Sequence, residues 1–166
     1  MGKINDIDIT GLIKQKSGAP LGDAHELFSR AILMRLGLEV GKVDLSSSAY
    51  DIILKVMDGA GRKVFIRAQV KTVDQSLPLV GGVRAGIDRT YKSGVKGYKY
   101  SEKDTDLILG VDRQSLDIYV VPVGFIQNLG NSIGKGKLSG LKDNWDILLN
   151  WNQSYLTALK SKLGFP

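Results

Sequence analysis

Two neighbouring segments, residues 50–54 and 64–72, constrain the fold of this chain more than any other feature. Both are rich in the extended-backbone formers Val, Ile and Phe, and the turn-forming run Asp58-Gly59-Ala60-Gly61 separates them. In the second segment, alternation gives one apolar face of Val64, Ile66, Ala68 and Val70. The opposite face carries Phe65, Arg67, Gln69 and Lys71. The sequence therefore predicts a β-hairpin with one face packed and the other available for chemistry.

Asp51 opens the first of these strands, so the hairpin brings it beside the end of the second strand, near Gln69 and Lys71. A carboxylate next to an amide oxygen suits a hard cation such as Mg²⁺. A lysine amine beside that ion can orient or deprotonate an attacking water, or neutralise charge as a phosphate ester is cleaved. This set is typical of phosphodiester hydrolysis. The alternative is that Asp51 is a turn residue and the other two lie on a solvated strand face.

A helix is predicted over residues 21–36, ending at Gly37, and a strand over 38–45 follows it. Glu26 lies at the border of the helix between core and solvent, where it either pairs with Arg30 or points toward the metal site. His25 faces about 100° away from Glu26, so we expect it to pack or to lie at the surface rather than to catalyse. The apolar stripe that we expect to face the core recurs at three and four residues and consists of Leu21, Ala24, Leu27, Phe28, Ala31 and Met34.

The order helix, strand, strand bearing Asp51, hairpin, strand bearing Gln69-Val70-Lys71 resembles the PD-(D/E)XK nuclease superfamily. Within it, Tyr-Asp-Ile-Ile followed by Gln-Val-Lys-Thr is similar to the small branch that includes predicted phage and archaeal endonucleases and some intron-encoded homing endonucleases. In that branch, Gln often replaces the acidic residue of the motif. The resemblance covers about residues 21–123, with a further similarity at residues 141–148.

The resemblance implies a fold of the α/β class with a restriction-endonuclease-like core, in which helices flank a mixed central β-sheet. We expect a single nuclease domain over residues 1–166, with its core at about 21–123 and a C-terminal extension at 124–166. The implied activity is an endonuclease that uses Mg²⁺, for which Mn²⁺ can substitute. Water would attack the phosphodiester bond in line and leave 5′-phosphate and 3′-hydroxyl ends.

The same resemblance assigns roles to individual residues. Asp51 and Gln69 would hold the metal ion, Lys71 would position the attacking water, and Glu26 would assist the metal or its water. A backbone carbonyl, that of Val70, is a further candidate ligand. Two departures from the family pattern are the absence of a Pro before Asp51 and the neutral Gln69. Because an amide brings no negative charge, we expect weak Mg²⁺ affinity until phosphate oxygens complete the coordination shell.

Composition narrows the classes of partner and site. Lys and Arg number 23 against 17 Asp and Glu, which gives a net charge of +6 and favours a polyanionic partner. No cysteine is present, so disulfide frameworks and thiolate metal sites are excluded. The single histidine, His25, argues against a zinc cluster or a Ser-His-Asp triad. No run of about 18 apolar residues and no signal core occur, so we expect no membrane contact and a cytoplasmic location.

A glycine-rich segment after the hairpin, residues 84–103, is predicted to grip the phosphate backbone of DNA. It has a net charge of +4 and interleaves Tyr91, Tyr98 and Tyr100 with its cations. The alternative is a solvated loop with its tyrosines packed onto the core. The DNA-binding candidates of this segment are Arg84, Arg89, Lys92, Lys96 and Lys99.

The remaining segments complete the expected fold. Residues 106–111 and 117–123 are predicted to form a second hairpin whose strands are covered on both faces. Residues 130–140 are expected to form a mobile loop in which Lys135 and Lys137 contact the DNA backbone. A short helix is predicted at 141–148 and a last one at 153–163. The apolar stripe of that last helix either closes the core or forms an oligomer interface.

These observations predict a metal-dependent endonuclease that acts on double-stranded or branched DNA. One site on an 18.1 kDa chain cuts one strand per encounter, so we expect a homodimer or a higher homo-oligomer. A site-specific homing enzyme is slightly favoured, and a Holliday junction resolvase or a restriction-type enzyme would share the same core. The competing classes are a DNA-binding module that keeps the fold without catalysis, and an assembly protein whose basic loop aids solubility.

Overall fold

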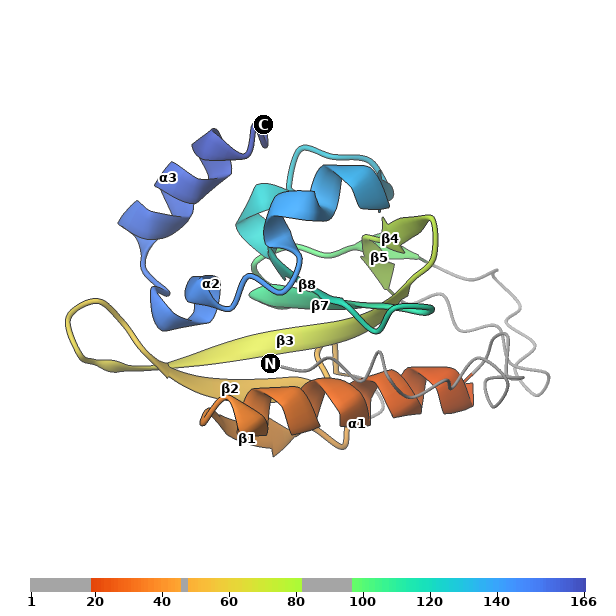
Figure 1. Cartoon of the computed structure of the whole chain (residues 1–166), viewed down its shortest axis with the longest axis horizontal. Helices are drawn as coiled ribbons and strands as arrows, with labels where there is room; N and C mark the ends of the chain where they lie inside the picture. Colours follow the sequence, from red (N-terminus) through yellow and green to blue (C-terminus); the bar gives the residue numbers. More distant parts are fainter. Residues whose placement is uncertain (1–18, 46–47, 82–96) are drawn as a thin grey trace.

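A five-stranded mixed sheet forms the centre of the computed structural model, which describes residues 19–45, 48–81 and 97–166. The strand order is β1-β2-β3-β7-β8, with β3 and β7 parallel and the other neighbours antiparallel. The bounds are Glu39–Lys42 (β1), Ile52–Met57 (β2), Lys63–Val73 (β3), Leu107–Asp112 (β7) and Ile118–Pro122 (β8). Helix α1 (Ala19–Arg35) lies on one side of the sheet and the C-terminal helices lie on the other (Figure 1). The predicted α/β class, a mixed sheet flanked by helices, is confirmed.

The predicted hairpin of strands β2 and β3 is present, with Ile52 opposite Ala68 and Met57 opposite Lys63. Asp58 closes its turn, because its Oδ1 accepts hydrogen bonds from the backbone N–H groups of Ala60 (2.9 Å) and Arg62 (2.8 Å). The apolar face of β3 packs as predicted, with Ile66, Ala68 and Val70 buried. This hairpin sets the register that places Asp51 next to Gln69.

Helix α1 matches the predicted bounds, and Gly37 follows it with a φ of +85°, a conformation that glycine adopts readily. The predicted core-facing stripe is partly wrong. Leu27 and Met34 are 61% and 58% exposed, whereas His25 and Ser29 are buried. Because the prediction counted only apolar residues, it missed that α1 turns two polar residues toward the sheet. The buried positions recur at every fourth residue and are Leu21, His25, Ser29 and Leu33.

His25 packs between α1 and the sheet, where its Nδ1 forms a 2.8 Å hydrogen bond with Oγ1 of Thr72 on β3. Burial lowers the pKa of His25, the charge of Arg113 lowers it further, and that of Asp112 opposes the change. The folded state therefore favours the neutral imidazole, while the unfolded chain takes up a proton near the ordinary pKa of 6.5. The stability that depends on neutral His25 is complete above pH 6.5 and declines as the pH falls toward the lowered folded pKa.

We expect the wild type to lose stability between pH 7.5 and pH 5.0 by about 1 kcal/mol more than a His25→Gln variant, which has no imidazole to protonate. Urea denaturation at both pH values measures this difference within each protein. Since the comparison is internal to each protein, any constant cost of the substitution cancels. Parallel loss of stability in the two proteins would contradict the assignment of a buried neutral histidine.

Strands β7 and β8 form the predicted second hairpin, and every residue of both strands is buried. The prediction that both faces are covered is therefore confirmed. Asp112 organises the connecting turn, since its Oδ1 accepts hydrogen bonds from the N–H groups of Gln114 (2.9 Å) and Ser115 (3.0 Å). The turn ends at Leu116, which has a φ of +57°.

Two small antiparallel sheets extend this core. Strand β4 (Ser76–Pro78) pairs with β9 (Ser132–Gly134), and β5 (Val80–Gly81) pairs with β6 (Tyr98–Lys99). The expectation of a mobile loop over residues 130–140 is thus wrong. Strand β9 and the 3₁₀ helix η3 (Lys135–Leu141) occupy that stretch, and the side chains of Ile133 and Leu138 are buried. Their burial anchors a segment that composition alone marked as flexible.

The C-terminal part of the chain covers the second face of the sheet through η2 (Val123–Phe125), η3, α2 (Asp146–Leu149) and α3 (Gln153–Lys162). Ile147 and Leu148 of α2 are buried in the same cluster as the strands. The predicted stripe on the last helix closes the core, because its members pack against that cluster. These half-buried residues are Tyr155, Leu156, Leu159 and Leu163.

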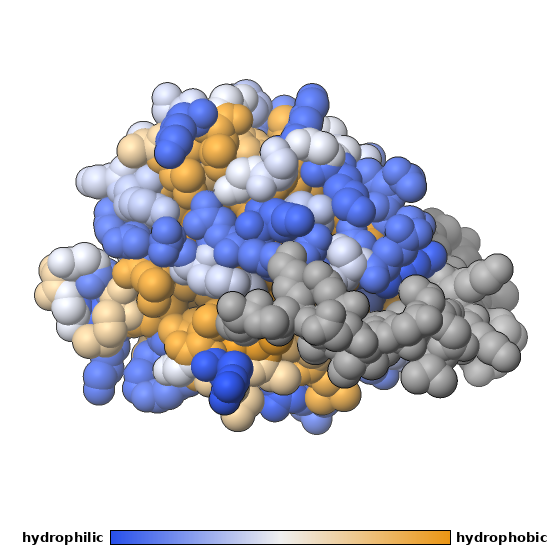
Figure 2. Space-filling view, in the orientation of Figure 1, coloured by the Kyte–Doolittle hydropathy of each residue, from blue (hydrophilic) through white to orange (hydrophobic). Residues whose placement is uncertain are grey.

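The surface is mostly polar on the face drawn in Figure 2, with apolar side chains gathered in the lower part, where α1 and β2 lie, and in a second area at the top, where α3 lies. Leu27 and Met34 of α1 and Met57 of β2 are among the exposed apolar residues. Within the described parts of the chain, no helix combines the length and the hydropathy that crossing a bilayer requires.

Candidate active site

Asp51 lies at the entrance to β2 and is fixed by its backbone on both sides. Its N–H donates to the carbonyl of Ala68 (2.9 Å) on β3, and its carbonyl accepts from the N–H of Val43 (2.8 Å) beyond β1. The carboxylate points along β3, where its Oδ2 accepts a 2.9 Å hydrogen bond from the N–H of Val70 and another from the side-chain amide of Gln69. The structure thus brings Asp51 and Gln69 into contact, as the hairpin predicted.

Gln69 is nearly buried, with 8% of its surface exposed. Its Nε2 donates to Oδ2 of Asp51 and also to the carbonyl of Val70 (3.1 Å). One nitrogen therefore lies between two oxygens, one from a carboxylate and one from the backbone. A half-turn of the terminal amide would direct Oε1 to the same point and make a third oxygen available there. Carboxylate, amide and carbonyl oxygens form the donor set that Mg²⁺ and Mn²⁺ take, so these residues fit a hard cation.

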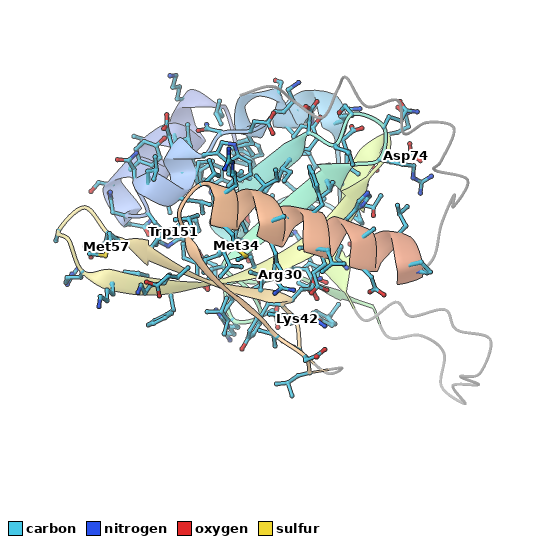
Figure 3. The ribbon with its side chains drawn as sticks, turned by 60° about the horizontal axis from the view of Figure 1, so that its bottom comes forward. Arg30, Met34, Lys42, Met57, Asp74 and Trp151 are labelled. Atoms are coloured by element: carbon cyan, nitrogen blue, oxygen red, sulfur yellow. The ribbon has the colours of Figure 1, made fainter. Side chains whose placement is uncertain are left out.

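Glu26, the remaining candidate for the metal site, lies on α1. Partial burial raises the pKa of its carboxyl, and the negative charge of Asp51 raises it further, whereas Lys42 and Arg30 lower it. The negative charges of Glu26 and Asp51 therefore repel each other. Arg30 of α1 and Lys42 of β1 also interact electrostatically with each other, and Figure 3 shows both where α1 crosses β1. Glu26 thus interacts electrostatically with both Asp51 and Arg30, and its two expected roles stay predictions.

Lys71 follows Gln69 by two residues on β3, so its side chain leaves the same face of the strand. Its Nζ lies over the ring of Tyr100, 5.2 Å from the ring centroid. Its neighbour on β7 is Gly110, which presents no side chain on that face. Lys71 is half-buried and shares a strand face with Gln69, and its role beside a metal ion stays a prediction.

The described residues contain no group of three or more His, Cys, Asp and Glu side chains close enough to hold a metal ion together. A cation here would depend on two carboxylates, those of Asp51 and Glu26, with the Gln69 amide and the Val70 carbonyl as neutral donors. The weak Mg²⁺ affinity expected from the sequence stays a prediction.

The structure describes three of the seven predicted DNA-binding cations, and their surroundings differ. Lys99 donates to the carbonyls of Gln127 (2.7 Å) and Leu129, and so ties β6 to the chain after η2. Lys135 forms an ion pair with the buried carboxylate of Asp112. Both lysines therefore have structural partners, whereas Lys137 on η3 is exposed. The other four candidates, Arg84, Arg89, Lys92 and Lys96, lie outside the described residues.

Two features near the site were missed from the sequence. Arg67 appeared only as a member of a polar strand face, but its guanidinium binds both carboxylate oxygens of Asp106 (2.9 and 3.0 Å) and the carbonyls of Glu102 and Lys103 (both 2.7 Å). These hydrogen bonds connect β3 to residues 102–106, which directly precede β7. Tyr100 is buried, in agreement with the alternative that the tyrosines of this segment pack onto the core, but its contact with Lys71 was missed. Its spacing of two from Tyr98, typical of a strand, was the available signal.

No established protein family matches this sequence, and no curated protein matches it. Among solved structures, the fold is similar to that of a bacterial homing endonuclease, I-Ssp6803I, with a TM-score of 0.61 and 20% sequence identity. The similarity covers 86% of this chain and 97% of that structure. At this level of identity it concerns the fold, and it agrees with the α/β architecture described above.

Proposed function

We propose that this protein is a metal-dependent DNA endonuclease with a PD-(D/E)XK-type site, of the site-specific homing kind. The observation that carries the proposal is the convergence of the Asp51 carboxylate, the Gln69 amide and the Val70 carbonyl at one point, with Lys71 on the same strand face. The likeness of the fold to that of a homing endonuclease supports it. The net charge of +6 favours the polyanionic substrate.

In this proposal, Asp51, Gln69 and the carbonyl of Val70 hold Mg²⁺, and Glu26 assists through the metal or its water. The ion supplies Lewis-acid polarisation of the phosphate and a water of lowered pKa. Lys71 orients the attacking water and stabilises the negative charge that grows on the phosphate oxygens. Gln69 keeps the site organised without the ion, because its amide N–H groups satisfy the Asp51 carboxylate and the Val70 carbonyl.

The proposed partner is DNA, and the functional unit is a homodimer or a larger homo-oligomer. A single site hydrolyses one phosphodiester bond per encounter, so a double-strand cut requires either two subunits or two successive encounters. Symmetric pairing of two copies would present one site to each strand.

Cleavage assays on three substrates test the proposal: supercoiled plasmid, a synthetic four-way junction, and a library of duplexes with randomised sequence. Each is incubated with Mg²⁺, with Mn²⁺ or with chelator. We expect metal-dependent cutting by the wild type and a fall in rate of about a thousandfold in Lys71→Ala. Lys162→Ala, which removes an exposed lysine from α3, is the matched control and should retain wild-type activity.

The choice of substrate separates the finer alternatives. Selection of one sequence from the library supports a homing or restriction-type enzyme, and preference for the junction identifies a resolvase. Cutting that persists with chelator, or that is equal in Lys71→Ala and the control, would contradict the proposed site. Salt-sensitive DNA binding without cutting of any substrate would identify a non-catalytic module.

A further inference from the structure

The ammonium group of Lys71 is held against an aromatic ring. Its Nζ lies over the face of Tyr100, 5.2 Å from the centroid, within the range in which a cation is attracted to the electron-rich face of a ring. A lysine side chain has four rotatable bonds, so holding it in one conformation costs conformational entropy. The residue paired with it on β7 is Gly110, which has no side chain to restrict Lys71. The ring of Tyr100 supplies such a restraint.

Tyr100 is itself fixed by the small β5–β6 sheet. Only 3% of its surface is exposed, and its N–H donates to the carbonyl of Leu79 (3.1 Å). The ring of Tyr98 meets it edge to face, with centroids 5.6 Å apart. A side chain at Gly81 would place its Cβ 2.7 Å from the Tyr100 hydroxyl oxygen and 2.9 Å from Cζ, so only glycine permits this close approach. The ring is thus positioned by packing from three sides.

We propose that Tyr100 is a positioning residue for Lys71, which holds the lysine ammonium in place by a cation–π contact. The inference rests on the function proposed above, because Lys71 needs a fixed position only if it orients water or stabilises charge in the reaction. The ring, and not the hydroxyl group, performs this role, since Nζ lies over the ring face. Phenylalanine should therefore replace Tyr100, and a non-aromatic side chain of similar volume should not.

Nuclear magnetic resonance tests the contact without any reference to activity. Protons above a ring face are shifted upfield, so the ε-methylene protons of Lys71 should resonate upfield of the other lysines, with the signal assigned by its absence in Lys71→Arg. We expect the shift to persist in Tyr100→Phe and to disappear in Tyr100→Leu. Phe65→Leu is the matched control, because it removes an exposed aromatic ring near the start of β3, and it should keep the shift. Loss of the shift in Tyr100→Phe, or its absence from the wild type, would overturn the contact.

Cleavage kinetics test the consequence for the reaction. We expect Tyr100→Leu to lower kcat about tenfold with little change in KM, and Tyr100→Phe to restore the wild-type rate. Gly81→Ala keeps the ring but forces it to move, so it should also lower kcat. A general folding defect would lower the fraction of active enzyme in each variant, and active-site titration by single-turnover bursts corrects for it.

The two measurements separate failure of the inference from failure of the proposed function. If the wild type cleaves and Tyr100→Leu keeps its kcat, the positioning role is wrong while the nuclease assignment stands. If no substrate is cut, the nuclease assignment fails, and the positioning role in catalysis falls with it even where the upfield shift confirms the contact. An equal loss of kcat in Tyr100→Phe and Tyr100→Leu would assign the effect to the hydroxyl group and overturn the role given to the ring.

Discussion

Replacement of Asp51 by asparagine is expected to lower the rate of metal-dependent cleavage at least about a thousandfold and to weaken Mn²⁺ binding more than about tenfold. Asp51 brings a negative charge to the point where the Gln69 amide and the Val70 carbonyl meet. Its replacement by asparagine removes that charge from the proposed metal site. Asparagine keeps the shape of the side chain and can still accept from the N–H of Val70, so the fold should persist.

Two measurements check this expectation, single-turnover cleavage and calorimetric titration with Mn²⁺. Asp74→Asn is the matched control: Asp74 follows the end of β3, is 56% exposed, and pairs with Arg113 at 3.5 Å. It should change neither the rate nor the affinity appreciably. A variant Asp51→Asn that binds Mn²⁺ as tightly as the wild type would exclude Asp51 as a ligand, and the cation would then have to be sought elsewhere.

The core of the candidate site was predictable because it depends on one local hairpin. Once Ile52 pairs with Ala68, Asp51 must lie beside Gln69, and alternation then puts Lys71 on the same face. No distant part of the chain has to be known for this step. The two hairpins and the amphipathic helix were also predictable from local apolar patterns, and the resemblance in the order of these elements implied the fold class.

The parts that the sequence missed depend on contacts between distant segments. The role of Lys135 as a DNA contact stays a prediction, but its ion pair with Asp112, from the turn between β7 and β8, was missed. The face of α1 that carries His25 lies against the sheet, where the imidazole forms a hydrogen bond with Thr72 on β3. The hydropathy of one segment does not reveal that a polar residue in it is buried when its hydrogen-bond partner lies on another element.

Replacing Asp112 by alanine is expected to destabilise the protein by about 3 kcal/mol. Although burial raises the pKa of Asp112, the hydrogen bonds from Lys135, Ser115 and Gln114 outweigh it and hold the pKa below the usual range. Alanine removes the acceptor that closes the β7–β8 turn and leaves the Lys135 ammonium without its buried counter-ion. Urea denaturation at pH 7.5 measures the loss, and Asp112→Asn, which keeps an acceptor for the turn, should lose less.

Variants of the Lys135–Asp112 ion pair test whether Lys135 is a structural residue or a DNA contact. Lys135→Met leaves a buried carboxylate unpaired, so it should cost about 2 kcal/mol, whereas Lys137→Met on the same 3₁₀ helix should cost less than about 0.5 kcal/mol. In the double variant Asp112→Asn with Lys135→Met, the two losses should not add, because neither partner is left charged and buried. Equal stability of Lys135→Met and Lys137→Met would contradict the structural role. A fall in DNA affinity for both variants would then return Lys135 to the set of DNA contacts, because an ammonium group not needed by Asp112 is available to a phosphate.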